Sequence, residues 1–202
     1  MPDRIVGRLQ DQETVEERVA SGAAPDWVAA HWRTFREGIL GDRGGAPFPC
    51  FFGVESVENG DPLYTAVPST TDKDALLNLG RTLLAYLNTY RGHSDRASLV
   101  TFFRPPEHDR SEADYHDLLW HVLQFLHVHD PEPWPDHIPT DPNSCEWAFC
   151  FAREPFLPPC RAPLYDERRS LYCPAGLEIT FQPPARFDAL DVTADHPRGT
   201  AL

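Results

Sequence analysis

The hydrophobic positions along the chain follow two patterns, a period of about 3.6 residues that is typical of helices and short apolar runs that are typical of strands. Helical spacing predicts three helices, within residues 24–40, 70–90 and 111–130. The expected N-caps are, in order, Asp26, Thr71 or Asp72, and Ser111. The middle helix is the clearest, because leucines at every third or fourth position from Leu76 to Leu87 share one face.

Short apolar runs predict five extended segments. Two of them flank the turn-rich Asn59-Gly60-Asp61-Pro62 and predict a hairpin within residues 47–68. The other three lie within residues 98–103, 147–156 and 176–188. A proline-rich crossing at residues 130–144 precedes the fourth segment, and its prolines exclude both a helix and a central strand.

The order of these elements predicts the architecture. Strands come in pairs instead of alternating with helices, which favours antiparallel neighbours over parallel crossovers. We therefore expect an α+β fold in which a mixed, largely antiparallel sheet packs against three helices. One domain is expected at residues 24–190, after a loosely ordered polar arm at 1–23 and before a frayed tail at 191–202.

Composition and charge narrow the class of protein. The 202 residues are 41% hydrophobic and include 21 prolines, about twice the average usage, so much of a globular chain must be loop. A formal net charge of −13 disfavours nucleic-acid and membrane-surface partners and is compatible with a cationic small substrate. No apolar leader or membrane-spanning run is visible, and the expected location is the cytoplasm.

The cysteines predict free thiols. Their number is odd and no CxxC pair occurs among Cys50, Cys145, Cys150, Cys160 and Cys173. A zinc site built from two of them with His127 and His129 would lack any standard spacing.

His127 raises the main chemical question, because it shares a helical stripe with Trp120 and Leu123. A core histidine that hydrogen-bonds a carbonyl, or an imidazolium near the helix C-terminus, would explain it. A metal or haem ligand would explain it as well, since a neutral imidazole on an apolar, aromatic-rich wall suits a flat cofactor. The residues alone leave these alternatives open.

Four segments in order resemble the YqcI/YcgG family of small bacterial proteins. They are "APFPCFFG", an LQxLHxxDxxPWP signature at residues 123–135, the WxFCF strand at 147–151, and "YDERRS" with "GLEITFQPPARFD". The resemblance covers roughly residues 45–190. It implies haem b and a haem-dependent N-hydroxylase of guanidines, of the guanitoxin-pathway type, with a histidine as axial ligand.

The resemblance also assigns residue roles as expectations. His127 would be the axial ligand, oriented by Asp130, with Trp134 and Trp147 clamping the haem. The thiol of Cys50 is a rival axial ligand that the residues themselves leave open, apart from the resemblance. Arg168 and Arg169 would hold a carboxylate of cofactor or substrate.

A guanidine substrate is cationic and needs a carboxylate to hold it. Glu146 and Glu178 are the two candidates, and Glu178 should lie on the strand face opposite Leu177 and Ile179. Dioxygen and electrons from an external donor would complete the reaction, and a homodimer is left open.

The chain departs from the family pattern at Arg153, Leu171 and Pro184, which leaves the substrate in doubt. Three rival functions stay open. They are a haem enzyme with another nitrogen chemistry such as N–N bond formation, a haem or gas-binding protein without turnover, and a zinc-stabilised interaction module.

Overall fold

The computed structural model describes residues 5–41, 48–94, 96–108 and 110–184. Its helices are α1 (Gln12–Ala20), α2 (Asp26–Leu40), α3 (Phe51–Asn59), α4 (Lys73–His93) and α5 (Glu112–Val128). Its strands are β1 (Leu63–Val67), β2 (Leu99–Phe103), β3 (Phe149–Phe151), β4 (Glu154–Phe156), β5 (Cys160–Arg161) and β6 (Glu178–Phe181).

Four strands form the main sheet, in the order β1-β2-β6-β5. The β1–β2 pair is parallel and is joined through α4, whereas β2–β6 and β5–β6 are antiparallel. Strands β3 and β4 form a separate antiparallel hairpin. The expected α+β fold with a mixed, largely antiparallel sheet in one domain is thus confirmed, with five helices among the described residues in place of the expected three.

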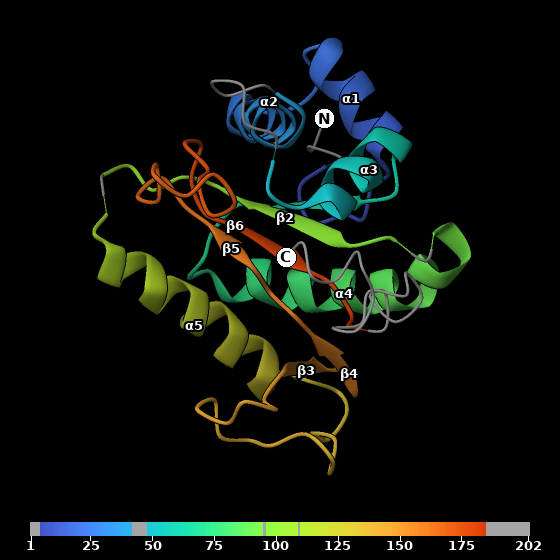
Figure 1. Ribbon diagram of the computed structural model, residues 1–202, viewed down its shortest axis with the longest axis vertical. Coiled ribbons are helices and arrows are strands. Elements are labelled where there is room, and N and C mark those ends of the chain that lie inside the picture. Colours follow the sequence, from blue (N-terminus) through green and yellow to red (C-terminus); the bar gives the residue numbers. More distant parts are fainter. Residues whose placement is uncertain (1–4, 42–47, 95, 109, 185–202) are drawn as a thin grey trace.

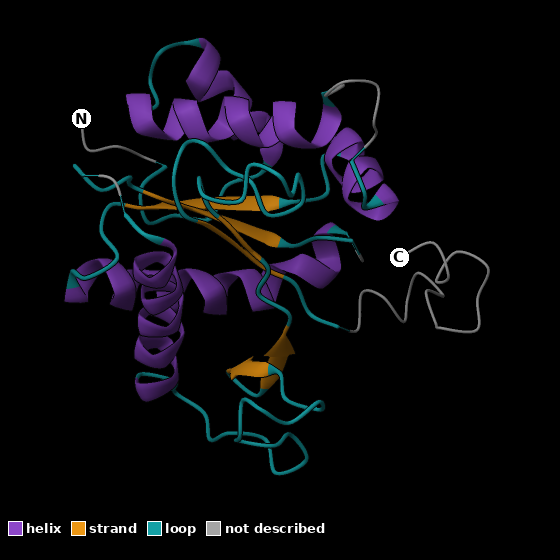
Figure 2. Cartoon of the chain, turned by 60° about the vertical axis from the view of Figure 1, so that its left-hand side comes forward, coloured by secondary structure: helices purple, strands orange, loops and turns teal. Residues whose placement is uncertain are grey.

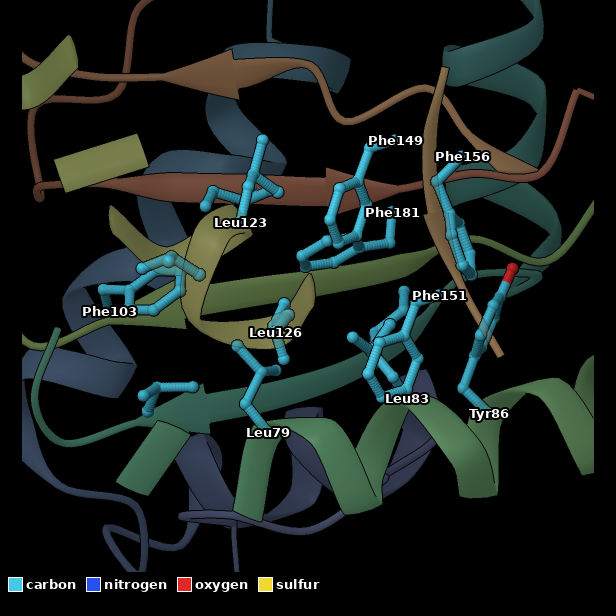
Figure 3. Close-up of a cluster of buried hydrophobic side chains, with 14 of the residues drawn as sticks. Leu79, Leu83, Tyr86, Phe103, Leu123, Leu126, Phe149, Phe151, Phe156 and Phe181 are labelled. Atoms are coloured by element: carbon cyan, nitrogen blue, oxygen red, sulfur yellow. The ribbon is translucent and has the colours of Figure 1, made fainter. Parts of the chain in front are cut away.

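The helices cover both faces of the sheet. Helices α1, α2 and α3 lie on one face, and α4 and α5 lie on the other (Figures 1 and 2). The larger apolar core fills the second side, where Leu79, Leu83 and Leu126 meet the rings of Phe151 and Phe181 (Figure 3). None of the described helices combines the length and the apolar character needed to cross a membrane.

Alternation along β6 gives the sheet two different faces. Ile179 and Phe181 belong to the core with α4 and α5. Glu178 points to the side of α2 and α3, where it is completely buried. The expected placement of Glu178 opposite Leu177 and Ile179 is therefore confirmed.

The first half of the expected hairpin is wrong, because residues 51–59 form helix α3. The thiol of Cys50 caps this helix by accepting a hydrogen bond from the Gly53 amide at 3.3 Å, and Gly60 ends it with a left-handed φ of 74°. A short apolar run cannot be assigned to helix or strand from periodicity alone. The predicted turn at 59–62 exists, but it joins a helix to β1.

Residues 5–23 are better packed than the loose arm expected there. Ile5 and Val15 are buried in the core between α2 and the sheet, and isolated bridges join Val6 and Gln10 to β1. The frayed tail expected at 191–202 lies outside the described residues.

The helix starts agree with two of the three predicted caps. Ser111 and Asp114 form a reciprocal capping box at α5, and Asp72 accepts from the Ala75 amide at α4. Asp26 is the first residue of α2 and not its cap, since Pro25 takes that position.

Candidate functional site

Most of the candidate residues line or adjoin one of two hollows in the structure. The first, called here the tryptophan hollow, has a volume of about 140 Å³ and is lined chiefly by Trp120, Leu123, His127, Trp134, Trp147 and Phe149. The second, called here the sheet cavity, has a volume of about 250 Å³ between α2, α3 and the sheet. Its wall includes Phe35, Phe48, Cys50, Arg161, Glu178 and Gln182.

The rings of the tryptophan hollow come from α5 and from both ends of the proline-rich crossing. Trp120 and Trp147 lie 5.8 Å apart, and His127 meets Trp134 edge-on at 5.3 Å between centroids. Two indole N–H groups are bound elsewhere, since Trp120 donates to His116 and Trp134 donates to the carbonyl of Ile138. These bonds fix the ring planes before any ligand arrives.

His127 lies at the margin of the apolar stripe of α5. The buried stripe is formed by Tyr115, Leu118, Val122, Leu123 and Leu126, whereas the His127 side chain is exposed and borders the hollow. The expected apolar neighbourhood of His127 is therefore present on one side only.

Asp130 has a structural role that its expected contact with His127 did not include. Both of its oxygens lie 3.0 Å from the Ala152 amide, and one accepts from the Glu132 amide at 2.9 Å. Ala152 and Arg153 form the β3–β4 turn with φ of 50° and 64°, a conformation that favours glycine. Asp130 thus ties the end of α5 to the turn of the β3–β4 hairpin.

The proline-rich crossing, which supplies Trp134, Thr140 and Pro142 to the tryptophan hollow, is acidic. The segment 130–146 contains no lysine or arginine and has five carboxylates, on Asp130, Glu132, Asp136, Asp141 and Glu146. Glu146 is exposed and directly precedes Trp147. The crossing therefore brings negative charge to an aromatic wall.

The sheet cavity is organised by a buried ion pair. Arg161 of β5 donates to Glu178 of the neighbouring β6 at 3.0 Å, and to the Tyr172 carbonyl through Nε and Nη2. A Cβ at Gly38 would lie 2.5 Å from Arg161 Nη2, so this glycine of α2 leaves the space that the guanidinium fills. The guanidinium also lies over the ring of Phe35.

Glu178 has one oxygen in use and one without a partner. Oε1 accepts from Arg161, whereas Oε2 is buried and has no hydrogen-bond partner among the described residues. Burial raises the pKa of this carboxyl, whereas the guanidinium of Arg161 and, more weakly, the nearby thiol of Cys173 act in the opposite direction. A buried acceptor that lacks a partner indicates a missing ligand or a stored cost.

Cys50 lines the sheet cavity, and Arg169 contacts Phe48 of its wall, whereas Arg168 does not line the cavity. Arg169 donates to the carbonyls of Gly38 and Gly41 and lies over Phe48, and Cys50 caps α3. Arg168 is exposed. The residues that the resemblance assigns to haem are thus divided between the tryptophan hollow and the sheet cavity.

Neither hollow fits a haem in this arrangement. Pockets that enclose drug-sized ligands measure roughly 300–1,000 Å³. The volume beside His127 is about 140 Å³, and that of the sheet cavity is about 250 Å³. The expected propionate partners, Arg168 and Arg169, do not line that hollow. The role of His127 as axial ligand stays a prediction.

Sequence reasoning missed three buried polar residues, His31, Arg161 and Cys173. His31 could have been found, because it shares the apolar stripe of α2 with Val28 and Phe35. Arg161 had no local signal, since its partner Glu178 is 17 residues away and meets it only through strand pairing.

Comparisons with known proteins agree on one family. The model of the YqcI/YcgG family matches residues 35–201. The uncharacterised proteins YqcI and YcgG of Bacillus subtilis (strain 168) are 30% and 32% identical over 91% and 83% of this chain. A Streptomyces lavendulae protein named "Putative N(omega)-hydroxy-L-arginine synthase DcsA" is 30% identical over 75% of it.

The relatives are longer than this chain. The matched regions span 70% of YqcI, 66% of YcgG and 58% of DcsA, so the chain covers about two thirds of their length. No solved structure matches the chain.

Proposed function

Because this chain belongs to the YqcI/YcgG family, we propose that it hydroxylates a nitrogen of a guanidine or a related amine, and that the tryptophan hollow holds the cationic group. The observation that carries the proposal is an aromatic hollow of suitable size, one side of which is formed by an acidic segment without lysine or arginine. The name of the relative DcsA describes a synthase of N(omega)-hydroxy-L-arginine, which is an N-hydroxylated guanidine.

Size favours a small planar group in the hollow. An apolar cavity of about 150 Å³ accommodates benzene, and the tryptophan hollow has about 140 Å³. A guanidinium is planar and smaller than benzene, so its size is compatible with the volume of the hollow. The remainder of the substrate would extend to solvent past His127, whose side chain is exposed.

Charge favours a cation in the same place. Tryptophan is the best aromatic partner for a guanidinium, and such contacts contribute about 0.5–2 kcal/mol depending on desolvation. The five carboxylates of residues 130–146 add a favourable long-range field, which salt would screen. The sheet cavity is a poorer place for a guanidinium group, because its lining carboxylate, Glu178, is already paired with the guanidinium of Arg161.

N-hydroxylation requires dioxygen, electrons and protons in addition to the substrate. One oxygen atom of dioxygen forms the N–O bond and the other leaves as water, with two electrons and two protons consumed. The electrons come from an external donor, and the reaction would take place in the cytoplasm. The residues of the hollow bind and orient the nitrogen and exclude water from the ring faces.

Haem b is the cofactor that the family resemblance implies, and it remains part of this proposal. Because the surroundings of His127 do not fit a macrocycle in the present arrangement, no role in the reaction is assigned to His127 through haem. An absorption spectrum of protein expressed with a haem precursor tests the cofactor. A Soret band that His127→Ala removes would support His127, and an unshifted band in that variant would contradict it.

Turnover tests the proposal as a whole. The protein is incubated with L-arginine, an external reductant and ¹⁸O₂, and the product is analysed by mass spectrometry. We expect a product that has gained one labelled oxygen on the guanidine. Trp134→Leu should lower kcat/KM about tenfold, the loss expected for about 1.4 kcal/mol of binding free energy.

Trp27→Leu is the matched control, because Trp27 is a partly buried tryptophan of α2 outside the hollow. Its turnover should equal that of the unchanged protein. Equal turnover in the Trp134 variant, or oxygen incorporated at carbon, would contradict the proposal.

A further inference from the structure

Three buried side chains from distant parts of the chain meet beside the sheet cavity. His31 lies in α2, Cys173 in the loop before β6 and Glu178 in β6, and all three are completely buried. One potential ligand atom from each lies within 4.8 Å of the other two. This group is called the buried cluster below.

The imidazole of His31 is held in one orientation. Its Nε2 lies 2.8 Å from the carbonyl of Phe103, so Nε2 carries the proton and Nδ1 presents a lone pair. The ring stacks on Phe102 at 5.1 Å, and a Cβ at Gly176 would lie 3.3 Å from Nε2. A histidine with one ring nitrogen bound to a carbonyl is the usual arrangement of a metal ligand.

The free nitrogen points at sulfur. His31 Nδ1 lies 3.7 Å from Cys173 Sγ. In a tetrahedral zinc site with Zn–N of about 2.0–2.1 Å and Zn–S of about 2.3 Å, the nitrogen and sulfur ligands lie about 3.6 Å apart. The observed separation therefore matches the edge of such a site.

Glu178 offers the third donor. Its Oε1 is bound by Arg161, and Oε2 is the buried oxygen without a partner among the described residues. A cation at the cluster would provide that partner and relieve the cost of an unsatisfied buried acceptor. Arg161 would then fix the carboxylate from its other side, as outer partners of metal-binding carboxylates do.

We propose that His31, Cys173 and Glu178 bind a divalent transition-metal ion of the zinc type. Nitrogen, thiolate and carboxylate donors are the ligands that zinc takes in proteins, and three protein ligands leave one coordination position for water or a small molecule. Binding forms bonds from the metal to nitrogen, sulfur and oxygen and releases the thiol proton of Cys173 to solvent. The sheet cavity, which Glu178 lines, is the route of entry.

This site is independent of the proposed N-hydroxylation, which places the substrate in the tryptophan hollow. Failure of either proposal therefore leaves the other standing.

Cobalt is the probe, because a thiolate bound to Co²⁺ gives a charge-transfer band in the near ultraviolet. The full chain is treated with EDTA and a phosphine reductant, the chelator is removed, and Co²⁺ is titrated. We expect a band that saturates at one equivalent and disappears when one equivalent of Zn²⁺ is added. No band with millimolar Co²⁺ would overturn the proposal.

Variants identify the thiol. Cys173→Ser should abolish the band, whereas Cys150→Ser should keep it, because Cys150 is a buried thiol of β3 outside the cluster. A band that survives in folded Cys173→Ser would overturn the assignment.

Thermal unfolding of the unchanged chain provides a measurement that needs no variant. A metal that binds only the folded state raises the Tm. Zn²⁺ should therefore raise the Tm of the EDTA-treated protein, and Mg²⁺, which prefers oxygen donors, should not. An unchanged Tm with Zn²⁺ would also overturn the proposal.

Discussion

His127 and His31 are both histidines on amphipathic helices, and their surroundings differ in every respect. His127 borders an open aromatic hollow at the end of α5 and is exposed, whereas His31 is completely buried between α2 and the sheet. An exposed aromatic wall suits a ligand that arrives and leaves. A buried polar cluster must be satisfied permanently, because unpaired polar groups in the interior are costly.

The largest loss of stability is expected from breaking the ion pair between Arg161 and Glu178, beside the buried cluster. Glu178→Ala leaves the guanidinium of Arg161 buried without its carboxylate, which should lower the free energy of unfolding by about 3–5 kcal/mol. Urea denaturation measures this. Glu146→Ala removes an exposed carboxylate and should change stability by less than about 0.5 kcal/mol. Similar losses in both variants would show that the pair is not tightly coupled.

The pH dependence of stability should reveal the burial of His31. Burial lowers the pKa of His31 to about 4. As the pH falls from about 6.5 towards 4, the unfolded chain gains a proton there that the folded chain does not, so stability decreases by up to about 3 kcal/mol. The raised pKa of Glu178 acts in the opposite direction, and it is present with or without His31.

His31→Gln separates the contribution of His31 to the pH dependence of stability from that of Glu178. In EDTA-treated protein, the unfolding free energy of the unchanged chain should fall more steeply between pH 6.5 and 4 than that of this variant. Parallel curves for the unchanged chain and His31→Gln would contradict the burial argument.

Gly38→Ala tests the space reserved for Arg161. The new Cβ would lie 2.5 Å from Nη2 of a guanidinium that three hydrogen bonds hold in place. We expect a loss of about 1–3 kcal/mol from overpacking. Gly92→Ala is the matched control in α4, where no atom lies within 4 Å of the new Cβ, and it should stabilise by about 0.5–1 kcal/mol.

Asp130→Ala should have the smallest effect on stability, a loss of about 1–2 kcal/mol from its amide contacts. The effect that distinguishes Asp130→Ala from a general loss of stability is confined to the β3–β4 turn. Hydrogen exchange at the Ala152 amide should accelerate far more than exchange in β2. Asp136→Ala, an exposed carboxylate of the same crossing, should leave both rates unchanged.

Local patterns predicted the parts of the fold that local forces determine. The helical periods and the Ser111 cap were predicted correctly, because apolar spacing and caps act within a few residues. The segment 51–59 was assigned wrongly, since a run of apolar residues suits a buried strand and a short helix equally well.

The buried cluster was beyond local reasoning. His31 and Cys173 are 142 residues apart in sequence and meet only after α2 packs on the sheet. The stripe argument used for His127 applies more fully to His31, whose neighbours on α2 are buried. The same pattern would therefore have identified His31 as a buried histidine, but not Cys173 or Glu178 as its neighbours.

Binding of L-arginine compared with L-citrulline tests the central claim most directly, since the two differ in charge while sharing a planar end group. Isothermal titration needs neither cofactor nor reductant. We predict that L-arginine binds at least tenfold more tightly than L-citrulline, that Trp134→Leu abolishes the difference and that Trp27→Leu preserves it. Equal affinities in the unchanged protein, or a preference that survives in Trp134→Leu, would contradict a cation site in the tryptophan hollow.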